Sequence, residues 1–341
     1  MNKLSEKPFV TVFMPVYNAG KYLNEAIISI LNQTYENFEF LIVNDGSTDD
    51  SLNTIKSFND KRIRLIENES NKGLITSLNV GLTESRGEYI VRMDADDISL
   101  PNRIEKQINF LISNPEYGLL GSWFEDFGEN IPNKIVKYSS EDTEIRIRHL
   151  YQTHISHPTA VIKKKIIDKY NLQFDSDRVH GEDYDFWVRI SEYCKMSNYP
   201  EILVRKRDHP KSITNHYSKS MSETCTKVKQ YQFQKMGIEL NRTQLDLYTR
   251  FADPEWHFNP SELNTLEEML NNIILANDTS AFIPVDDFRY YISEKWFHLC
   301  YHNNKIKNQG FIRFHRSHFS KYFNLSTVSK LKFRIKSAIS K

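Results

Sequence analysis

The chain has 341 residues, of which 39% are hydrophobic and 13% aromatic, and its formal net charge is +1 at pH 7. This composition excludes a disordered chain, and the near-neutral charge excludes a nucleic-acid-binding protein whose whole surface is basic. Cys194, Cys225 and Cys300 lie far apart, which indicates neither a zinc knuckle nor a disulfide framework. The sequence also lacks an apolar run of roughly 18–20 residues and a signal-peptide core, and we therefore expect a cytoplasmic protein.

The first hundred residues alternate between apolar, β-branched runs and stretches with helical spacing. The expected strands are residues 9–14, 38–43, 62–67 and 88–93, and the expected helices are residues 26–31, 51–58 and 74–82. Because strands separated by helices of this length need right-handed crossovers, we expect an α/β fold with a mostly parallel sheet flanked by helices. In such sheets ligands bind beyond the carboxyl ends of the strands.

Polar and turn residues follow each of the first three strands. Tyr17 offers a ring that can stack on a base, and Asp45 offers acceptors to a base imide or a ribose hydroxyl. The alternative for the second turn is an Asx-turn with Asp49 or Thr48 as a helix cap, which explains part of the segment. Lys72 is a cation available to a phosphate or else a solvated surface charge. Neither GxxxxGK[ST] nor GxGxxG occurs, so a Walker-type ATPase and a nicotinamide Rossmann domain both lack their fingerprints.

Three carboxylates, Asp94, Asp96 and Asp97, crowd the end of the fourth strand. Carboxylates this close repel one another, so they need a cation. Asp94 and Asp96 can both turn toward one hard divalent ion, which is often held by one or two carboxylates plus substrate phosphates. The alternative is a solvated acidic turn that caps a helix starting at Pro101.

Four motifs follow one another along the chain: VFMPVYN at 12–18, VNDGSTD at 43–49, NKG at 71–73 and MDADD at 93–97. In this order and spacing they resemble a family 2 glycosyltransferase with a GT-A fold, over about residues 8 to 215. The resemblance implies a nucleotide-diphosphate-sugar donor, usually a UDP-sugar, a Mn²⁺ or Mg²⁺ ion, and inversion at the anomeric carbon. By position it implies Pro15 and Tyr17 beside the base, Asp45 at uracil, Lys72 near the nucleotide, Asp94 at the ribose or the metal, and Asp96 at the metal. Asp97 is left to orient its neighbours or to cap the helix.

The middle of the chain supplies a candidate base. The run HGEDYDFWVR at 180–189 puts acids ahead of an amphipathic helix whose Trp187 is expected to pack inward. The family's Glu-Asp motif falls on Glu182 and Asp183, and because an inverting transfer needs a carboxylate to take the acceptor's proton, we predict Asp183 as the base. Its pKa would be raised by its surroundings, with Trp187 excluding water. The alternative is that the helix macrodipole alone favours these acids.

Two further segments fit the resemblance. Residues 205–214 resemble the family's basic segment that closes over the donor. The resemblance places Arg207 and His209 at the diphosphate and His209 also within reach of the metal. The alternative is a surface loop. Residues 154–159 lie near where the family binds the acceptor, which makes His157, with Trp187, an acceptor-side candidate. A structural histidine is the alternative.

Beyond about residue 215 the resemblance fades and helical spacing appears at 218–235, 261–275 and 285–302. From 305 to 341 basic residues meet no Asp or Glu and are interleaved with aromatic and aliphatic ones, which suits an anionic membrane surface; a frayed terminus or a nucleic-acid-like patch are the alternatives. The expected catalytic domain spans 1–215, with a nucleotide-sugar-binding half at 8–100 and an acceptor-binding half at 101–215. A helical extension is expected at 216–304 and a basic amphipathic tail at 305–341.

The predicted function is that of an inverting, metal-dependent glycosyltransferase of the hexosyltransferase type, with no nucleic-acid partner. It would extend a saccharide or lipid-linked oligosaccharide for capsule or O-antigen on the inner face of the plasma membrane. The runner-up is a catalytically silent sugar-nucleotide-binding or scaffolding protein, against which the presence of both Asp96 and Asp183 argues. A nucleotidyltransferase would need a glycine-rich phosphate loop after the first strand, and residues 15–20 do not form one.

Overall fold

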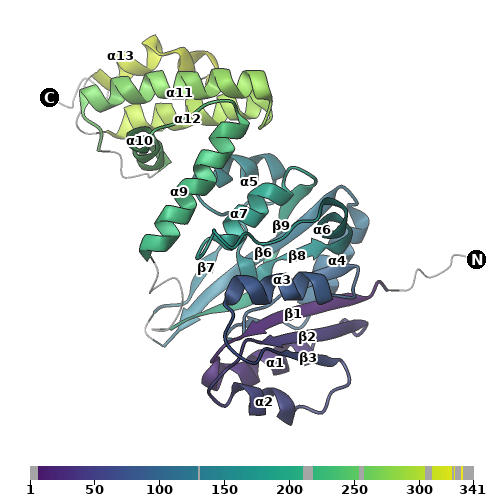
Figure 1. Cartoon of the computed structure of the whole chain (residues 1–341). Coiled ribbons are helices and arrows are strands. Elements are labelled where there is room, and N and C mark those ends of the chain that lie inside the picture. The colour runs from purple at the N-terminus through teal and green to yellow at the C-terminus, as the bar shows by residue number, and fades with distance from the viewer. Residues whose placement is uncertain are drawn as a thin grey trace, which may run out of the picture. The chain divides into compact units, whose positions relative to one another are not determined.

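The structure is a computed structural model that describes residues 7–129, 131–209, 218–252, 257–303 and 309–324, with residues 326 and 332. It divides into two compact units, the first ending at Cys225 and the second starting at Thr226 (Figure 1).

Parallel strands alternating with helices build the first part of the first unit. In chain order they are β1 (Val10–Val16), α1 (Leu23–Leu31), β2 (Phe38–Asn44), α2 (Ser51–Ser57), β3 (Ile63–Glu67), α3 (Leu74–Glu84) and β4 (Tyr89–Arg92). β1 pairs in parallel with β2 and β4, and β2 pairs in parallel with β3. The carboxyl ends of the four strands therefore meet at one edge of the sheet, as the sequence predicts.

Beyond β4 the sheet is mixed. The further strands are β5 (Ile98–Ser99), β6 (Tyr117–Gly128), β7 (Lys134–Val136), β8 (Val161–Lys163) and β9 (Lys195–Asp208). β8 is antiparallel to β4 and β6, β9 is parallel to β6, and β5 is antiparallel to β9. Within the described residues the sheet has nine strands in the order β3-β2-β1-β4-β8-β6-β9-β5, with β7 on β6. The predicted α/β fold is confirmed, but the sheet is mixed: β1 to β4 pair in parallel, as do β6 and β9, whereas β5, β7 and β8 pair antiparallel.

Four more helices of the first unit accompany the second part of the sheet: α4 (Arg103–Ser113), α5 (Asp142–His149), α6 (Lys164–Tyr170) and α7 (Glu182–Ile190). A short 3-10 turn, η2 (His157–Thr159), precedes β8. The helix expected from Pro101 begins at Arg103, after Asn102, whose side chain makes no capping hydrogen bond; Oε1 of Gln33 accepts one of 3.1 Å from the backbone N of Ile104 in the first turn. The acidic residues after β4 are therefore not its cap.

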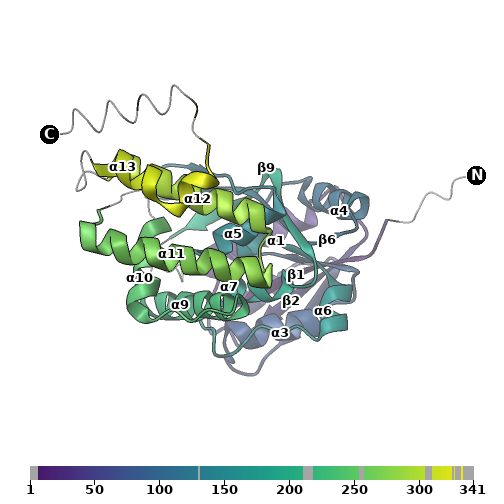
Figure 2. The ribbon, with the colours of Figure 1, turned by 90° about the horizontal axis from the view of Figure 1, so that it is seen from above.

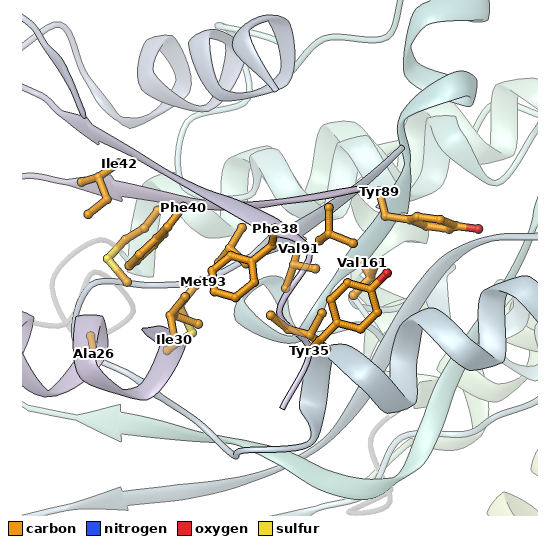
Figure 3. Close-up of a cluster of buried hydrophobic side chains, with 14 of the residues drawn as sticks. Ala26, Ile30, Tyr35, Phe38, Phe40, Ile42, Tyr89, Val91, Met93 and Val161 are labelled. Carbon is orange, nitrogen blue, oxygen red and sulfur yellow. The ribbon is translucent and has the colours of Figure 1, made fainter. Parts of the chain in front are cut away.

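Alternate residues of the central strands enter two cores on opposite faces of the sheet. Val12 and Phe40 belong to the core that includes α1, whereas Phe13 and Leu41 belong to the core that includes Leu78 of α3. Figure 1 shows α3 on one side of β1 to β3 and α1 and α2 on the other. Figure 3 shows the first core, where side chains of α1 face those of β2. A covered sheet of this kind holds its strand ends in fixed positions, because its interior is close-packed.

The second unit is helical. α9 (Ser218–Lys235) runs into it from the first unit, and α10 (Arg242–Ala252), α11 (Pro260–Ser280), α12 (Val285–His302), α13 (Gln309–Arg316) and η3 (His318–Lys321) follow. α11 begins with a capping box in which Asn259 and Glu262 exchange side-chain to backbone hydrogen bonds. Figures 1 and 2 both show α11 beside α12, and α13 packs on α12. The helices predicted at 218–235 and 285–302 are confirmed.

The predicted tail is described only in part. Residues 309–324 form α13, η3 and the turn after them, and apart from residues 326 and 332 the remainder of 305–341 lies outside the described residues. In α13, Nη2 of Arg313 lies 2.9 Å from Oε2 of Glu267. No helix in the described part of the chain combines the length and the apolar character that crossing a bilayer requires.

Candidate active site

The turns after β1 and β2 are tied together at the carboxyl edge of the sheet. Pro15 is buried within β1, and Tyr17, directly after the strand, has 49% of its surface exposed. Asn18 takes a left-handed conformation with φ of 49°, and its Oδ1 accepts a hydrogen bond of 2.8 Å from the backbone N of Thr48. Its own backbone N donates to Oγ of Ser47 at 3.0 Å. The Tyr17 ring is thus available to a ligand on a turn that its neighbours hold in place.

Asp45 anchors the loop after β3. Its buried carboxylate accepts hydrogen bonds from Nδ2 of Asn68 at 2.7 Å, from the backbone N of Lys72 at 3.0 Å and from the backbone N of Gly73 at 2.9 Å. These partners lie in another loop, so the Asx-turn alternative does not describe this carboxylate. Because an ionised carboxylate has about four lone-pair sites, the role expected at uracil would have to share the group with this anchoring role.

Gly46 lets the two loops touch. Its φ is +65°, and a β-carbon built on it would lie 2.5 Å from the backbone carbon of Ser70. Only a residue without a side chain fits here. Lys72, carried by the same loop, is exposed, in accord with both of its predicted roles.

The acidic residues after β4 have different partners. Oδ1 of Asp94 accepts a hydrogen bond of 2.6 Å from Nη2 of Arg92, and 35% of the Asp94 side chain is exposed. Oδ2 of Asp96 lies 2.9 Å from Nε2 of His209. Asp97 is buried; its Oδ1 accepts a hydrogen bond of 2.7 Å from the backbone N of Arg207, while its Oδ2 has no partner among the described residues. We call residues 94–97 the acidic loop.

Burial and mutual repulsion separate the pKa values of these acids. Burial raises the pKa of Asp97 well above its ordinary value, and the charges of Asp96 and Asp94 raise it further. The pKa of Asp96 is raised by burial and by Asp94, against the effect of His209. For Asp94 burial is the largest influence and raises the pKa, but the nearby cations, Arg92 foremost, outweigh it, so the net shift is downward. Folding thus favours the ionised form of Asp94 and the protonated form of Asp97.

The end of β9 lies over the acidic loop. Nε of Arg207 donates to the backbone O of Asp96 at 2.9 Å, and its Nη2 donates to Oε2 of Glu25 at 2.5 Å. The guanidinium lies 4.6 Å from the ring centre of Tyr22 and 4.4 Å from that of Phe127. Arg207 and His209 contact the acidic loop, but Arg207 already has protein partners, so its role at a diphosphate and the closure of residues 205–214 over a donor stay predictions. Residues 210–214 lie outside the described residues.

The donor set at the acidic loop fits a divalent cation. Carboxylate oxygens suit Mg²⁺ and Mn²⁺, and imidazole is also a transition-metal ligand. Asp96 and His209 are already within 2.9 Å of each other. No group of three or more His, Cys, Asp or Glu side chains within the described residues is arranged to hold a metal. Asp96 and His209 are therefore close enough to contribute ligands to one divalent cation.

Glu182 and Asp183 begin α7, as the sequence predicts for a helix N-terminus. Oε2 of Glu182 accepts a hydrogen bond of 3.0 Å from the backbone N of Gly181, and Oδ1 of Asp183 accepts one of 2.7 Å from the backbone N of Tyr184. Burial, and then the charge of Glu182, raise the pKa of Asp183 to about 7. The charge of Asp94 raises this pKa as well, so the acid pair lies within electrostatic reach of the acidic loop.

His157 and Trp187 lie behind the acid pair. Trp187 has no exposed surface, and its ring meets that of His157 edge-on at 5.7 Å between centres. Nδ1 of His157 lies 4.0 Å from Oε1 of Glu182, and 11% of its side chain is exposed. Burial lowers the pKa of His157 to about 3, with the charge of Arg92 adding to the effect. Trp187 is therefore a core residue that packs against His157 and offers no exposed surface to an acceptor.

Arg92 is a central residue that the sequence reasoning overlooked. It ends β4 and is buried, and besides Asp94 it contacts the backbone O of Met93 and, through Nε at 3.3 Å, Nε2 of His157. The signal in the sequence was a charged residue inside an otherwise apolar strand, between Val91 and Met93. Charged residues are almost never fully buried unless they are paired, so this position called for a partner.

Comparisons with known proteins identify the family of this chain. Residues 11–170 match the family model described as Glycosyl transferase family 2. The chain is 37% identical over 248 residues to an uncharacterized glycosyltransferase of Haemophilus influenzae, which covers 68% of this chain and 77% of that relative. It is 33% identical over 214 residues to the O-antigen biosynthesis glycosyltransferase WbnJ of Escherichia coli, covering 60% of this chain and 81% of that one.

A solved structure with a similar fold is that of S. aureus TarS 1–349 in complex with UDP-GlcNAc. The TM-score is 0.57 at 17% identity, and the alignment covers 89% of this chain and 90% of that one. At this identity the likeness concerns the fold alone, and it confirms the predicted GT-A class.

Proposed function

We propose a donor, an acceptor class and a base for this chain, which belongs to glycosyltransferase family 2 and is a glycosyltransferase. The donor is a UDP-sugar, and the acceptor is a hydroxyl of a saccharide or of a lipid-linked oligosaccharide. The sugar is transferred with inversion. The observation that carries this proposal is the Asp183 carboxyl group. Its pKa is raised to about 7, and the charge of Asp94 contributes to that shift.

Asp183 is the general base. A base works best when its pKa lies near the operating pH, and burial beside Glu182 brings Asp183 there. The acceptor oxygen forms a bond to the anomeric carbon while its proton passes to the Asp183 carboxylate. The bond between the anomeric carbon and the diphosphate oxygen breaks on the opposite face, and UDP leaves with the electron pair. The charge of Glu182 adds to the effect of burial in raising the pKa of Asp183, and burial raises the pKa of Glu182 as well.

Asp96, Asp94 and His209 would hold a Mn²⁺ or Mg²⁺ ion together with the diphosphate oxygens. Once bound, such an ion would neutralise the charge that develops on the departing UDP. The 2.9 Å approach of His209 to Asp96 supports this ligand set. Arg207 and Lys72 are the cations we assign to the nucleotide side.

Tyr17 and Asp45 are the residues we assign to the nucleotide base, with Pro15 supporting Tyr17 from within β1. The exposed ring of Tyr17 supports stacking. A fold shared with proteins solved with UDP-GlcNAc and with UDP supports uridine over other bases. His157 is assigned to the acceptor side, where it backs Glu182.

The acceptor proposal follows the relatives. WbnJ, by its name, acts in O-antigen biosynthesis, and this supports a saccharide acceptor in surface-polysaccharide synthesis. We assign catalysis to residues 1–215 and contact with an anionic membrane on its inner face to the basic tail at 305–341. A lipid-linked acceptor would be held at such a surface.

The test is release of nucleotide diphosphate from a panel of UDP- and GDP-sugars, with saccharide and lipid-linked acceptors, in Mn²⁺ and in EDTA. We expect acceptor-dependent release from one UDP-sugar, and loss of that release in EDTA. Release only from GDP-sugars would overturn the donor assignment. Binding of UDP in a thermal-shift assay without release from any donor would instead fit the catalytically silent alternative.

A further inference from the structure

We propose that Arg92 and His157 are positioning residues that connect the acidic loop to Glu182, so that the donor-binding and proton-accepting sides of the site are held by one line of contacts. The inference rests on the proposed function of the same site. It assigns a role to Arg92, which lies in none of the four motifs, and to His157, whose role the fold alone leaves open.

The line of contacts runs through the interior of the first unit. Nη2 of Arg92 donates to Oδ1 of Asp94 at 2.6 Å, and Nε of Arg92 donates to Nε2 of His157 at 3.3 Å. Nδ1 of His157 then lies 4.0 Å from Oε1 of Glu182. Only 4% of the Arg92 side chain is exposed. Water therefore screens these contacts little, and their electrostatic effect exceeds that of a surface pair.

Arg92 can serve two directions at once because of its geometry. A guanidinium is a rigid fork with five N–H donors and no acceptor, and it stays charged in proteins. One arm fixes a single oxygen of Asp94, whose side chain remains partly exposed toward the site. The Nε–H points instead to His157. A lysine, with its point charge, cannot reproduce both contacts in fixed directions.

The contact with Arg92 determines which nitrogen of His157 carries a hydrogen. Because Arg92 can only donate, Nε2 of His157 must accept, and the neutral ring then carries its hydrogen on Nδ1. That N–H faces Glu182 across 4.0 Å, a distance too long for a hydrogen bond but short for a dipole facing a carboxylate. The rings of Phe174 and Trp187, each 5.7 Å from that of His157, pack around it and limit its rotation.

The two nitrogens of His157 can be separated by mutation. A glutamine amide reaches the position of Nε2, so His157→Gln keeps an acceptor for Arg92 and loses the group that faces Glu182. An asparagine amide reaches the position of Nδ1, so His157→Asn keeps the group that faces Glu182 and leaves Arg92 without its acceptor. A purely structural role for His157 would not distinguish the two variants by their effect on catalysis and on binding.

The experiment measures kcat and the donor KM of the full-length chain, its affinity for UDP with Mn²⁺ by calorimetry, and its melting temperature. We expect His157→Gln to lower kcat by about 10-fold or more, with a smaller change in donor KM, in the range that loss of a supporting partner commonly has. We expect His157→Asn to raise the donor KM and the Kd for UDP by more than it lowers kcat. Arg92→Lys should resemble His157→Asn, and it replaces that variant if His157→Asn fails to fold.

Arg64→Gln is the matched control. Arg64 is also a strand arginine, and its Nε lies 2.9 Å from Oε2 of the buried Glu39, but both residues lie near the amino ends of their strands, away from the acidic loop. Its loss should lower the melting temperature and leave the ratio of kcat to KM effects unchanged. Equal losses of kcat and of UDP affinity in both His157 variants, in step with melting temperature, would overturn the inference.

Failure of the inference can be told apart from failure of the proposed function. A wild-type chain that releases nucleotide from no donor contradicts the function. The UDP affinities of the two His157 variants still test the Arg92 side in that case, because weaker binding is expected only when the acceptor for Arg92 is lost.

Discussion

Nε2 of His209 lies 2.9 Å from Oδ2 of Asp96, so the end of the β9 segment and the acidic loop meet at a carboxylate. This pair brings an imidazole and a carboxylate, both ligands of transition metals, together from segments more than a hundred residues apart in the sequence. The first prediction therefore concerns Asp96 as a metal ligand.

Asp96→Asn should abolish the effect of Mn²⁺ on UDP binding. The amide removes the negative charge that a divalent ion needs, so we expect calorimetric UDP affinity in Mn²⁺ to fall to the value measured in EDTA, and UDP release to fall by at least about 10-fold. An Asp96→Asn protein that still gains UDP affinity from Mn²⁺ would remove Asp96 from the ligand set.

Asp97 should tolerate the same substitution. Burial raises its pKa and so favours the protonated form, and an asparagine keeps an acceptor for the backbone N of Arg207. We expect Asp97→Asn to stay near wild type in melting temperature and turnover. Asp97→Ala should cost about 1–3 kcal/mol of unfolding free energy, because it leaves the Arg207 N–H without its acceptor. Chemical denaturation of both variants provides the comparison, and equal losses would count against the neutral acid.

Asp183→Asn should lower kcat by about 10²- to 10⁴-fold, the range that a general base contributes, with UDP affinity retained. In the wild type kcat/KM should fall as pH drops below about 7, because the base must be ionised and burial raises its pKa to about 7. A flat profile from pH 5 to 8 would contradict this assignment.

The same shift has a consequence for stability, with a definite sign. The folded-state pKa of Asp183 lies above its ordinary value of 3.8, so folding favours the protonated form. The stability from this group is therefore fully present below about pH 4 and is lost as pH rises through about 7. We expect Asp183→Asn to melt higher than wild type at pH 8 and to show little difference at pH 4, in thermal scans at both values.

Much of the nucleotide side could be predicted because it is local in sequence. Strands expected at 38–43 and 62–67 appear as β2 and β3, and the helix expected at 74–82 appears within α3, since apolar periodicity and turn residues mark each of them. The long pair of β6 and β9 carries no such local signal. Their partners lie some eighty residues apart, and their pairing brings Arg207 to the acidic loop.

The residue roles were harder to predict than the strands. A motif indicates which ligand an acid can bind. In the structure, however, Asp45 and Asp97 accept hydrogen bonds from backbone N–H groups that are distant in sequence. Arg92 escaped notice because its contact with His157, 65 residues further along the chain, exists only in the fold.

Asp45→Asn tests the anchoring role. The amide nitrogen cannot accept a hydrogen bond, so either the Gly73 N–H or the pair of donors on Oδ1 loses its acceptor. We expect a cost of about 1–3 kcal/mol in unfolding free energy together with weaker UDP binding. Asp50→Asn, at an exposed position in the neighbouring turn, is the control and should change neither quantity. Weaker UDP binding without any loss of stability would favour direct contact with the base.

Membrane contact is best tested in the full-length chain. Phe314 and Phe319 are buried in the second unit, so stopping the chain near residue 304 would remove part of a core. Replacing Lys330, Lys332, Arg334 and Lys336 by glutamine spares those residues. We expect weaker co-sedimentation with vesicles rich in phosphatidylserine, since each cation near such a surface contributes about 1 kcal/mol. Equal pelleting of both proteins would rule out the basic tail as the anchor.

Gly46 limits how this enzyme can be re-engineered. Any side chain there would wedge the backbone of residues 70–71 away from the turn after β2, and would strain a φ of +65° as well. A library aimed at a new donor can therefore vary exposed positions such as Tyr17 and Lys72. Variants at Gly46 should be lost from any selection because the two loops no longer pack, whatever their donor specificity.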